Sequence, residues 1–153
     1  MSSGQDFTVP LASVVLPAYN AGATIVETVQ SVLDQDFEDF ELIIVNDGST
    51  DDTDSLLKSF NDNRIVYQNR SHSGLVQTLN HGIEISRGQY ILRIDGDDVA
   101  YKHRFSTQIA YLQQNPGIGV LGSQALLINQ SGAPIGVANK PVGSQAVKEY
   151  CRY

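Results

Sequence analysis

The chain has 153 residues, of which 41% are hydrophobic and 18% are charged. This size and composition are typical of a single globular domain spanning residues 1–153. The formal net charge of −7 argues against a nucleic-acid partner, because non-specific binding to nucleic acid needs a basic face. No run of residues approaches the roughly 18 consecutive apolar residues of a membrane-spanning helix.

The cysteine content and the N-terminus bear on the cellular compartment. A single cysteine, Cys151, excludes an internal disulfide and suits a reducing compartment. Residues 1–9 lack the basic start and the apolar stretch of a signal peptide. We therefore expect a cytoplasmic protein, and a peripheral position at the inner face of the membrane is compatible with this for a full-length protein.

The N-terminal part of the chain predicts a strand followed by a helix. Leu11–Leu16 is an apolar run that we expect to form a strand ending at Pro17. Thr24-Ile-Val-Glu27 has the sequence of a capping box at the start of a helix. Five apolar residues at helical spacing then predict one buried helix face: Ile25, Val26, Val29, Val32 and Leu33.

A second strand and helix follow. Phe40–Val45 is almost continuously apolar, which favours a parallel strand covered on both faces. Asp51–Asp54 give the start of the next helix the negative charge that a helix N-terminus favours. The apolar face of that helix is predicted to consist of Leu56, Leu57 and Phe60.

The middle of the chain repeats this alternation. Ile65–Tyr67 predicts a short third strand, and Gly88 is a plausible stop for the helix that follows it. Tyr90–Ile94 is too short for a helix and predicts a buried strand. The buried face of the third helix is expected to contain Leu75, Val76, Leu79 and Ile83.

The remaining elements complete the fold class. A fourth helix with Phe105, Ile109 and Leu112 on its apolar face is expected to end at residues 115–117. Residues 118–128 predict another strand, and a turn at 131–134 leads into a weaker strand at 135–137. Strands that alternate with helices at this spacing predict an α/β, Rossmann-like fold with a mostly parallel sheet flanked by helices.

Three carboxylates surround one glycine directly after the fourth strand, at Asp95, Asp97 and Asp98. Charges this close repel one another, and in an apolar setting at least one carboxyl group stays protonated unless a cation binds. Mg²⁺ and Mn²⁺ prefer such hard oxygen ligands. The alternative is an Asp-Gly turn with exposed charges. We favour a metal site, because ligands bind at the carboxyl ends of strands in open α/β sheets.

Polar groups follow three predicted strands, at Pro17–Asn20, Asn46–Ser49 and Asp95–Asp98. In a parallel sheet these ends lie along one edge and form one crevice. An aromatic ring, a carboxylate and an acidic cluster together fit a nucleoside diphosphate. Tyr19 would pack on the base, Asp47 would accept the imide N–H of a pyrimidine, and the metal would neutralise the pyrophosphate. Taken singly, each feature is equally compatible with a core aromatic residue or with a turn and helix cap.

Other common sites find little support. No Gly-x-Gly-x-x-Gly fingerprint follows the first strand and no phosphate-binding loop ends in lysine, which disfavours dinucleotide-dependent dehydrogenases and P-loop enzymes. The histidines show no metal-ligand spacing, and among His72, His81 and His103 only His72 falls on a candidate loop over the crevice.

Longer motifs resemble one family. They are Val14–Asn20, Glu41–Thr53, Leu79–Ile83, Gly88–Ile91 and Arg93–Asp98, continued by Arg104, Phe105, Gln108, Asn115, Pro116, Gly122 and Ser123. The combination resembles the nucleotide-sugar-binding part of the family 2 glycosyltransferases, which have the GT-A fold. The resemblance covers residues 13–123 in register. Two positions depart from the family pattern: Gly96 stands where Ala or Ser is frequent, and Lys102 stands where Pro is usual.

The resemblance implies a nucleoside-diphosphate sugar as donor, most often a uridine one, with Mn²⁺ or Mg²⁺ as cofactor. It implies that Asp97 ligates the metal bridging the diphosphate, that Asp95 lies on the ribose and sugar side as a further metal ligand, and that Asp98 supports them. The nucleotide-sugar-binding residues that it implies are Pro17, Ala18, Tyr19, Asn20, Asp47, Gly48, Ser49, Asp95 and Gly96.

The family's acceptor-binding half and its general base lie beyond the position of Tyr153. Glu149 is the only carboxylate after Asp98, so we expect no catalytic base in this chain and a fold truncated on its C-terminal side. In the full-length enzyme the resemblance implies inverting transfer to a hydroxyl of a saccharide or lipid-linked acceptor, in cell-envelope polysaccharide biosynthesis. Apolar surface at residues 120–128 would favour a homodimer.

Two alternative functions remain open. Ile91–Val99 also fits an apolar strand followed by Asp-x-Asp-x-Val, as in haloacid-dehalogenase-like phosphotransferases, in which the first Asp is the nucleophile. That interpretation leaves Pro17–Asn20 and Asn46–Thr50 unexplained. The other alternative is a nucleotide-sugar-binding module without catalytic activity.

Overall fold

The computed structural model describes residues 9–140 and residue 143. The chain divides into two compact units, residues 1–111 and 112–153, which are described one at a time. Residues 1–8, Glu149 and Cys151, which entered the expectations above, lie outside the described residues. The expectation of one domain over residues 1–153 stays a prediction.

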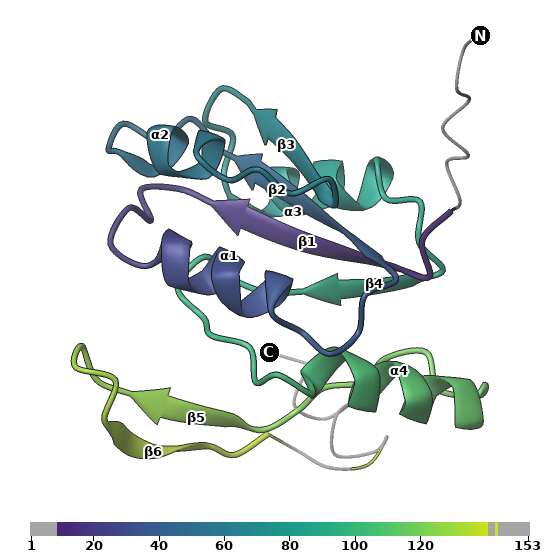
Figure 1. The fold of residues 1–153 in the computed structure, drawn as a ribbon. Helices are drawn as coiled ribbons and strands as arrows, with labels where there is room; N and C mark the ends of the chain where they lie inside the picture. The colour runs from purple at the N-terminus through teal and green to yellow at the C-terminus, as the bar shows by residue number, and fades with distance from the viewer. Residues whose placement is uncertain (1–8, 141–142, 144–153) are drawn as a thin grey trace, which may run out of the picture. The chain divides into compact units, whose positions relative to one another are not determined.

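The first unit is built on a four-stranded sheet in the order β3-β2-β1-β4 (Figure 1). All three strand pairs are parallel. The strands are β1 (Ala12–Ala18), β2 (Phe40–Asn46), β3 (Ile65–Asn69) and β4 (Tyr90–Arg93). The helices are α1 (Ile25–Leu33), α2 (Thr53–Lys58), α3 (Leu75–Glu84) and α4 (Arg104–Gln114), the last of which begins in this unit. The expected α/β architecture with a parallel sheet is confirmed.

β1 and β2 are buried along their whole length, because helices cover both faces of the sheet. Side chains alternate between the two faces of a strand. On one face, Val14 of β1 belongs to a core cluster that includes Ile25 of α1 and Phe105 of α4. On the other face, α3 packs so closely on β1 that a Cβ added to Gly82 would lie 2.5 Å from Cγ1 of Val15. Figure 1 shows α1 and α3 on opposite sides of the sheet.

The apolar face expected for α3 is wrong. Leu75, Val76 and Ile83 have exposed fractions of 54%, 70% and 50%. The buried residues of α3 are Thr78 and Gly82. Small residues face the sheet here because the helix axis lies close to β1, which leaves no room for larger side chains.

One helix boundary and one buried position also differ from expectation. Gly88 does not end α3, which stops at Glu84 with Ile85 as its C-cap. A Cβ on Gly88 would instead lie 2.5 Å from backbone atoms of Ala12 and Ser13, so glycine is needed there for a close approach to β1. In α1, Val26 is 45% exposed, so it does not belong to the buried face.

β4 is an edge strand rather than a fully buried one. Its only partner among the described residues is β1, and the pairing ends at Val15 and Arg93. Leu92 is buried, whereas Ile91 is 45% exposed. The apolar run at Tyr90–Ile94 therefore forms a strand that is covered on one face of the sheet and partly exposed on the other.

The second unit contains a two-stranded antiparallel sheet formed by β5 (Ala125–Ile128) and β6 (Pro134–Ala138). The predicted strand over residues 118–128 is thus confined to its last four residues. The turn between the strands is held by Asn129, whose side-chain Oδ1 accepts the amides of Ser131 and Ala133 at 3.0 and 2.9 Å. No helix within the described residues is both long and apolar enough to cross a membrane.

Candidate functional site

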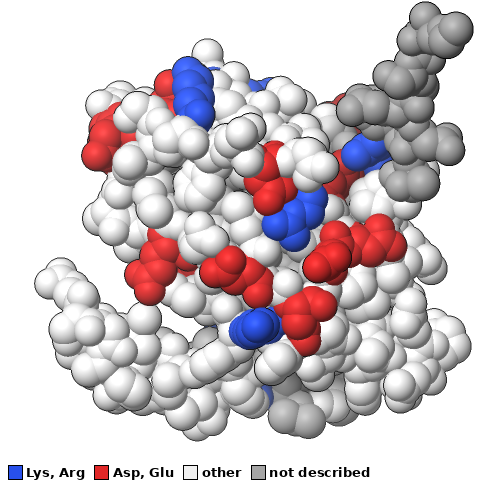
Figure 2. Space-filling model, in the orientation of Figure 1, with Lys and Arg blue, Asp and Glu red and all other residues white. Residues whose placement is uncertain are grey.

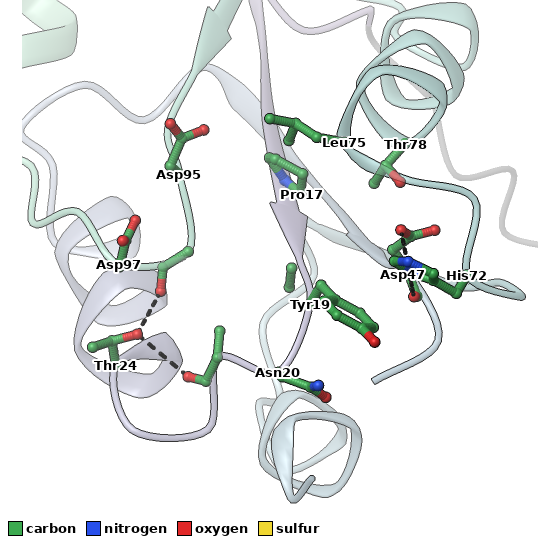
Figure 3. Close-up of a pocket in the computed structure, with 13 residues that line it drawn as sticks. Pro17, Tyr19, Asn20, Thr24, Asp47, His72, Leu75, Thr78, Asp95 and Asp97 are labelled. Atoms are coloured by element: carbon green, nitrogen blue, oxygen red, sulfur yellow. Dashed lines mark hydrogen bonds and ion pairs between the residues drawn. The ribbon is translucent and has the colours of Figure 1, made fainter. Parts of the chain in front are cut away.

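A cavity of about 410 Å³ opens at the carboxyl ends of β1 and β2, beside the turn that follows β4. It is lined by Pro17, Ala18, Tyr19, Asn20, Ala21, Thr24, Asp47, His72, Leu75, Thr78, Asp95, Gly96 and Asp97. Eight of the ten residues predicted for donor and metal binding are among them, and the two that are not are Gly48 and Ser49. Figure 3 shows Asp95 and Asp97 on one side of the end of β1, and Asp47 and His72 on the other.

β1 reaches the cavity because it does not end at Pro17, as the sequence suggested, but continues to Ala18. The carbonyl of Val15 accepts the amide of Ile94, beside β4, and the carbonyl of Ala18 accepts the amide of Asp47, beside β2. Backbone groups alternate in direction along a strand, so the amide that proline lacks would point to the β4 side. β4 has already ended there at Arg93, and no ladder hydrogen bond is lost.

Asp47 is buried at the floor of the cavity, with an exposed fraction of 3%. Its Oδ1 accepts the amide and the hydroxyl of Ser73 at 2.8 and 3.1 Å. Its Oδ2 accepts the amide of Gly74 at 2.9 Å. The same oxygen lies 2.9 Å from Nδ1 of His72. Both carboxylate oxygens are therefore already occupied by donors from the loop before α3.

These contacts fix the charge of Asp47. Burial disfavours the ionised carboxylate, but the amides of Ser73 and Gly74 outweigh this effect and hold the pKa of Asp47 below its ordinary value. Asp47 is thus an anion at neutral pH. An anionic acceptor with this geometry suits a ligand that presents an N–H group.

Tyr19 and His72 form the exposed wall of this side. Their rings stack with centroids 4.2 Å apart and an angle of 28° between planes. Tyr19 is 48% exposed, and the His72 side chain is 54% exposed. Two flat rings at the mouth of a cavity provide a surface on which a planar ligand can stack.

Gly48 and Ser49 hold the cavity without lining it. Gly48 has a φ of 71°, and a Cβ there would lie 2.7 Å from the backbone nitrogen of His72. Ser49 Oγ accepts the amide of Asn20 at 3.0 Å, and this hydroxyl in turn donates to Oδ1 of Asn46. Asn20 has a φ of 49°, in the left-handed region, which asparagine tolerates better than most residues. Gly48 and Ser49 thus shape the backbone of the site.

The acidic turn, Asp95–Asp98, forms the opposite side. Arg93 pairs with both oxygens of Asp95, at 2.8 and 2.9 Å. Asp98 has no such partner: the residue is exposed, but desolvation of its carboxyl group and the neighbouring charges of Asp95 and Asp97 raise its pKa. Figure 2 shows acidic side chains spread over this orientation of the molecule, with basic ones interspersed. The expected repulsion among the three carboxylates is thus only partly relieved, through the arginine beside Asp95.

The donor set at this turn fits a cation that arrives with a ligand. Within residues 9–140 and 143, no group of three or more His, Cys, Asp or Glu side chains is arranged to hold a metal alone. Mg²⁺ is characteristically bound by one or two carboxylates, with substrate phosphates and waters completing its shell. Asp95 and Asp97, which both line the cavity, match that pattern.

Thr24 was expected to form a capping box with Glu27, and this is wrong, because α1 has no side-chain cap hydrogen bond. The Thr24 hydroxyl donates instead to the carbonyl of Gly96 at 2.8 Å. Thr28 donates to the same carbonyl at 3.1 Å. The first turns of α1 therefore anchor the acidic turn in place.

Sequence reasoning did not include five residues that line the cavity: Ala21, Thr24, His72, Leu75 and Thr78. For His72, the sequence predicts a place on a loop over the crevice but no role. Leu75 is predicted on the buried face of the third helix, and its exposure at the cavity mouth follows from the unexpected orientation of α3. For Thr24, the capping-box pattern pointed to a different partner.

Comparison with known proteins identifies the family. The family model described as "Glycosyl transferase family 2" matches residues 13–131. The chain belongs to glycosyltransferase family 2. An uncharacterized glycosyltransferase of Haemophilus influenzae is 38% identical over 122 residues, which cover 78% of this chain and 38% of the relative. Glycosyltransferase GlyG of Streptococcus pneumoniae is 35% identical over 116 residues, covering 74% of this chain and 38% of the relative. The chain therefore spans less than half the length of these relatives.

Solved structures share the fold of this chain. TarS of S. aureus, residues 1–349 in complex with UDP-GlcNAc, superposes with a TM-score of 0.64 at 27% identity, covering 69% of this chain and 32% of TarS. The mannosyltransferase PcManGT from Pyrobaculum calidifontis, in complex with GDP-Man and Mn²⁺, has a TM-score of 0.62 at 21% identity, covering 69% of this chain and 33% of that protein. The fold is GT-A, as the sequence predicted.

Proposed function

We propose that the cavity binds a UDP-sugar together with Mn²⁺ or Mg²⁺. We propose further that the full-length protein transfers the sugar, with inversion, to a hydroxyl of a saccharide or lipid-linked acceptor. The observation that carries the proposal is one cavity lined by a buried anionic carboxylate and an aromatic ring on one side and by two carboxylates on the other. These groups match the base and the diphosphate of a nucleotide sugar.

The base is assigned to the Asp47 side. Uracil would stack on Tyr19 and donate its imide N–H to Asp47. Because both oxygens of Asp47 already accept hydrogen bonds, the base takes the place of one present donor. The remaining donors keep the carboxylate ionised and in position, so the acceptor is ready before the ligand arrives.

The diphosphate is assigned to the acidic turn. Asp97 and Asp95 would hold the cation, and the cation, when bound, withdraws charge from the leaving diphosphate as a Lewis acid. Gly96 lets the phosphates approach, because it has no side chain at the centre of the turn. Arg93 keeps Asp95 oriented through two hydrogen bonds.

The acceptor and the general base are assigned to parts of a longer protein. A base must lie within hydrogen-bond reach of the acceptor hydroxyl, and the relatives of this chain are more than twice its aligned length. We also propose a cytoplasmic enzyme of cell-envelope polysaccharide biosynthesis. The homodimer predicted from the apolar surface at residues 120–128 stays a prediction.

Calorimetric titration tests the proposal. UDP, GDP, CDP and dTDP sugars are titrated into the protein with Mn²⁺ and, separately, with EDTA. We expect the UDP-sugar to bind most tightly and Mn²⁺ to strengthen its binding by about ten-fold or more, because the cation offsets the repulsion between diphosphate and carboxylates.

Asp97→Ala is the decisive variant, and Glu84→Gln is its control, because Glu84 is an 80% exposed acid at the end of α3. We expect Asp97→Ala to lose the effect of Mn²⁺ and Glu84→Gln to keep it. Unchanged UDP affinity of Asp97→Ala in Mn²⁺ would count against the metal assignment. Nucleotide binding by a full-length protein that transfers no sugar would favour the non-catalytic module.

A further inference from the structure

The imidazole of His72 makes two distinct contacts at the cavity mouth. Its ring stacks on Tyr19 with centroids 4.2 Å apart. Its Nδ1 lies 2.9 Å from Oδ2 of Asp47 and 3.1 Å from the carbonyl oxygen of the same residue. Because both neighbours of Nδ1 are acceptors, this nitrogen carries the proton and donates.

These are the two contacts that the proposed function assigns to the nucleobase. A flat ring lies on Tyr19, and a ring N–H points to Asp47. We propose that His72 occupies the base position in the ligand-free protein, so that a nucleotide binds only by displacing this imidazole. This inference rests on the proposed function and adds a regulatory and specificity role for a residue outside the predicted set.

The surroundings of His72 allow the ring to leave without disturbing the floor of the cavity. Its side chain is 54% exposed, so rotation carries it into solvent. The amides of Ser73 and Gly74 continue to hold Asp47, one on each oxygen. The His72 backbone packs closely on Gly48, where an added Cβ would lie 2.7 Å from the His72 nitrogen, and rotation of the side chain does not require this backbone to move.

The exchange also selects among bases. When His72 leaves, only Oδ2 of Asp47 loses a donor and becomes able to accept a new one. Oδ1 keeps both of its donors from Ser73. The incoming ring must therefore supply an N–H at its edge, as uracil, thymine and guanine do. Cytosine presents an unprotonated ring nitrogen at the corresponding place and leaves the carboxylate without a ring donor.

The test is the UDP affinity of His72→Ala, measured by calorimetry at fixed pH in Mn²⁺. A competitor inside the site lowers the apparent affinity by the fraction of molecules in which the site is free. A single hydrogen bond from a half-exposed imidazole contributes little net free energy, so we expect His72→Ala to bind UDP about three- to ten-fold more tightly than the wild type. His72→Phe, which can stack but cannot donate, should fall between the two. His81→Ala on α3 is the matched histidine control and should bind as the wild type does.

A weaker or unchanged UDP affinity of His72→Ala overturns the inference, because a base-contacting or uninvolved histidine gives those results. If the wild type nevertheless binds UDP, the proposed function is retained and only the displacement by His72 is rejected. If neither protein binds any nucleotide, both proposals fail.

NMR provides a second readout on the wild-type protein. The ring proton signals of His72 should carry an upfield ring-current shift from Tyr19 that uridine removes on binding. Retention of this shift at saturating uridine would show that the imidazole has not moved and would overturn the displacement.

Discussion

On the Asp47 side of the cavity, each carboxylate oxygen accepts two donors in the ligand-free structure, whereas at the acidic turn only Asp95 has a bidentate partner. The pKa values of Asp47 and Asp98 shift in opposite directions because of this difference in hydrogen-bond partners. Burial of Asp47 is outweighed by its hydrogen bonds, which lower its pKa, while desolvation of the carboxyl group and neighbouring anions raise the pKa of Asp98. The Asp47 side has its hydrogen bonds in place without a ligand, and we propose that the nucleotide and its cation supply the missing partners of the acidic turn.

This difference separates two uses of the same residue type. A fully bonded aspartate contributes to the stability of the fold and to binding, so the two effects of its removal are linked. An aspartate held among like charges weakens the fold slightly, and under the proposed function it contributes to ligand binding. Substitutions on the Asp47 side should therefore lower both stability and ligand affinity. Substitutions at the acidic turn should lower ligand affinity with little change in stability.

The largest difference is expected between Asp47→Ala and Asp97→Ala. Removal of Asp47 leaves the amides of Ser73 and Gly74 without their acceptor, and we expect a loss of about 3 kcal/mol in the free energy of unfolding. Asp97 lies exposed, and its removal should change that free energy by no more than about 0.5 kcal/mol. Urea denaturation measures both. Equal losses would remove the distinction between the two sides.

A matched pair of glycines gives the next largest difference. Gly48→Ala places a Cβ at a φ of 71° and 2.7 Å from the His72 nitrogen, so we expect a loss of about 2 kcal/mol. Gly96→Ala meets only ordinary contacts, the nearest at 3.4 Å from the Pro17 carbonyl oxygen, and should stay within about 0.5 kcal/mol of the wild type. Thermal denaturation compares the two, and a more damaging Gly96→Ala would contradict the geometry.

Ser49→Ala probes the Asp47 side more gently. It removes the acceptor of the Asn20 amide and a donor to Asn46, so we expect a loss of about 1 kcal/mol in stability. Since Asn20 lines the cavity, UDP should also bind a few-fold more weakly. Ser55→Ala on α2 is the control, because its hydroxyl bonds only within its own helix. UDP affinity that is equal in both variants would show that Ser49 does not shape the site.

The smallest effect is the dependence on pH, in metal-free buffer. The lowered pKa of Asp47 gives stability that is fully present above its ordinary value of 3.8 and lost as the pH falls through the folded-state pKa. The raised pKa of Asp98 acts in reverse, with a penalty that appears as the pH rises above 3.8. Asp98→Asn should therefore gain up to about 0.5 kcal/mol at pH 7, where water screens the charges, and nothing at pH 3. A loss of stability at pH 7 would show that the Asp98 carboxylate is favourably bound.

The sequence predicted the sheet well because its signals are local. Continuous apolar runs at β1 and β2 require coverage on both faces, and the spacing between them requires helical crossovers. The carboxyl ends of these strands then meet by topology alone. The sequence alone therefore predicts that Tyr19, Asp47 and Asp97 meet in one crevice, and all three line the cavity.

The wrong predictions concern residues whose sequence pattern is compatible with more than one contact in the fold. Leu75, Val76 and Ile83 have helical spacing, but periodicity does not state which face meets the sheet, and Gly82 decides this by allowing close approach to β1. Thr24 has the sequence of a cap but donates across the fold to Gly96, a contact 72 residues away along the chain. The occupancy of Asp47 depends on a loop 26 residues later, which no local motif reveals.

The carbonyl of Gly96 has a consequence for movement within the first unit. Two threonine hydroxyls of α1 and its N-cap end on this single oxygen, and the amide of Ala21, just before that helix, is bound to the hydroxyl of Thr53 at the start of α2. Any tightening of the acidic turn around incoming phosphates must either pull this linkage along or break it at one oxygen atom. Hydrogen bonds thus connect the acidic turn to the start of α1 and the start of α1 to that of α2, so we expect a ligand bound as proposed at the turn to shift both helix starts.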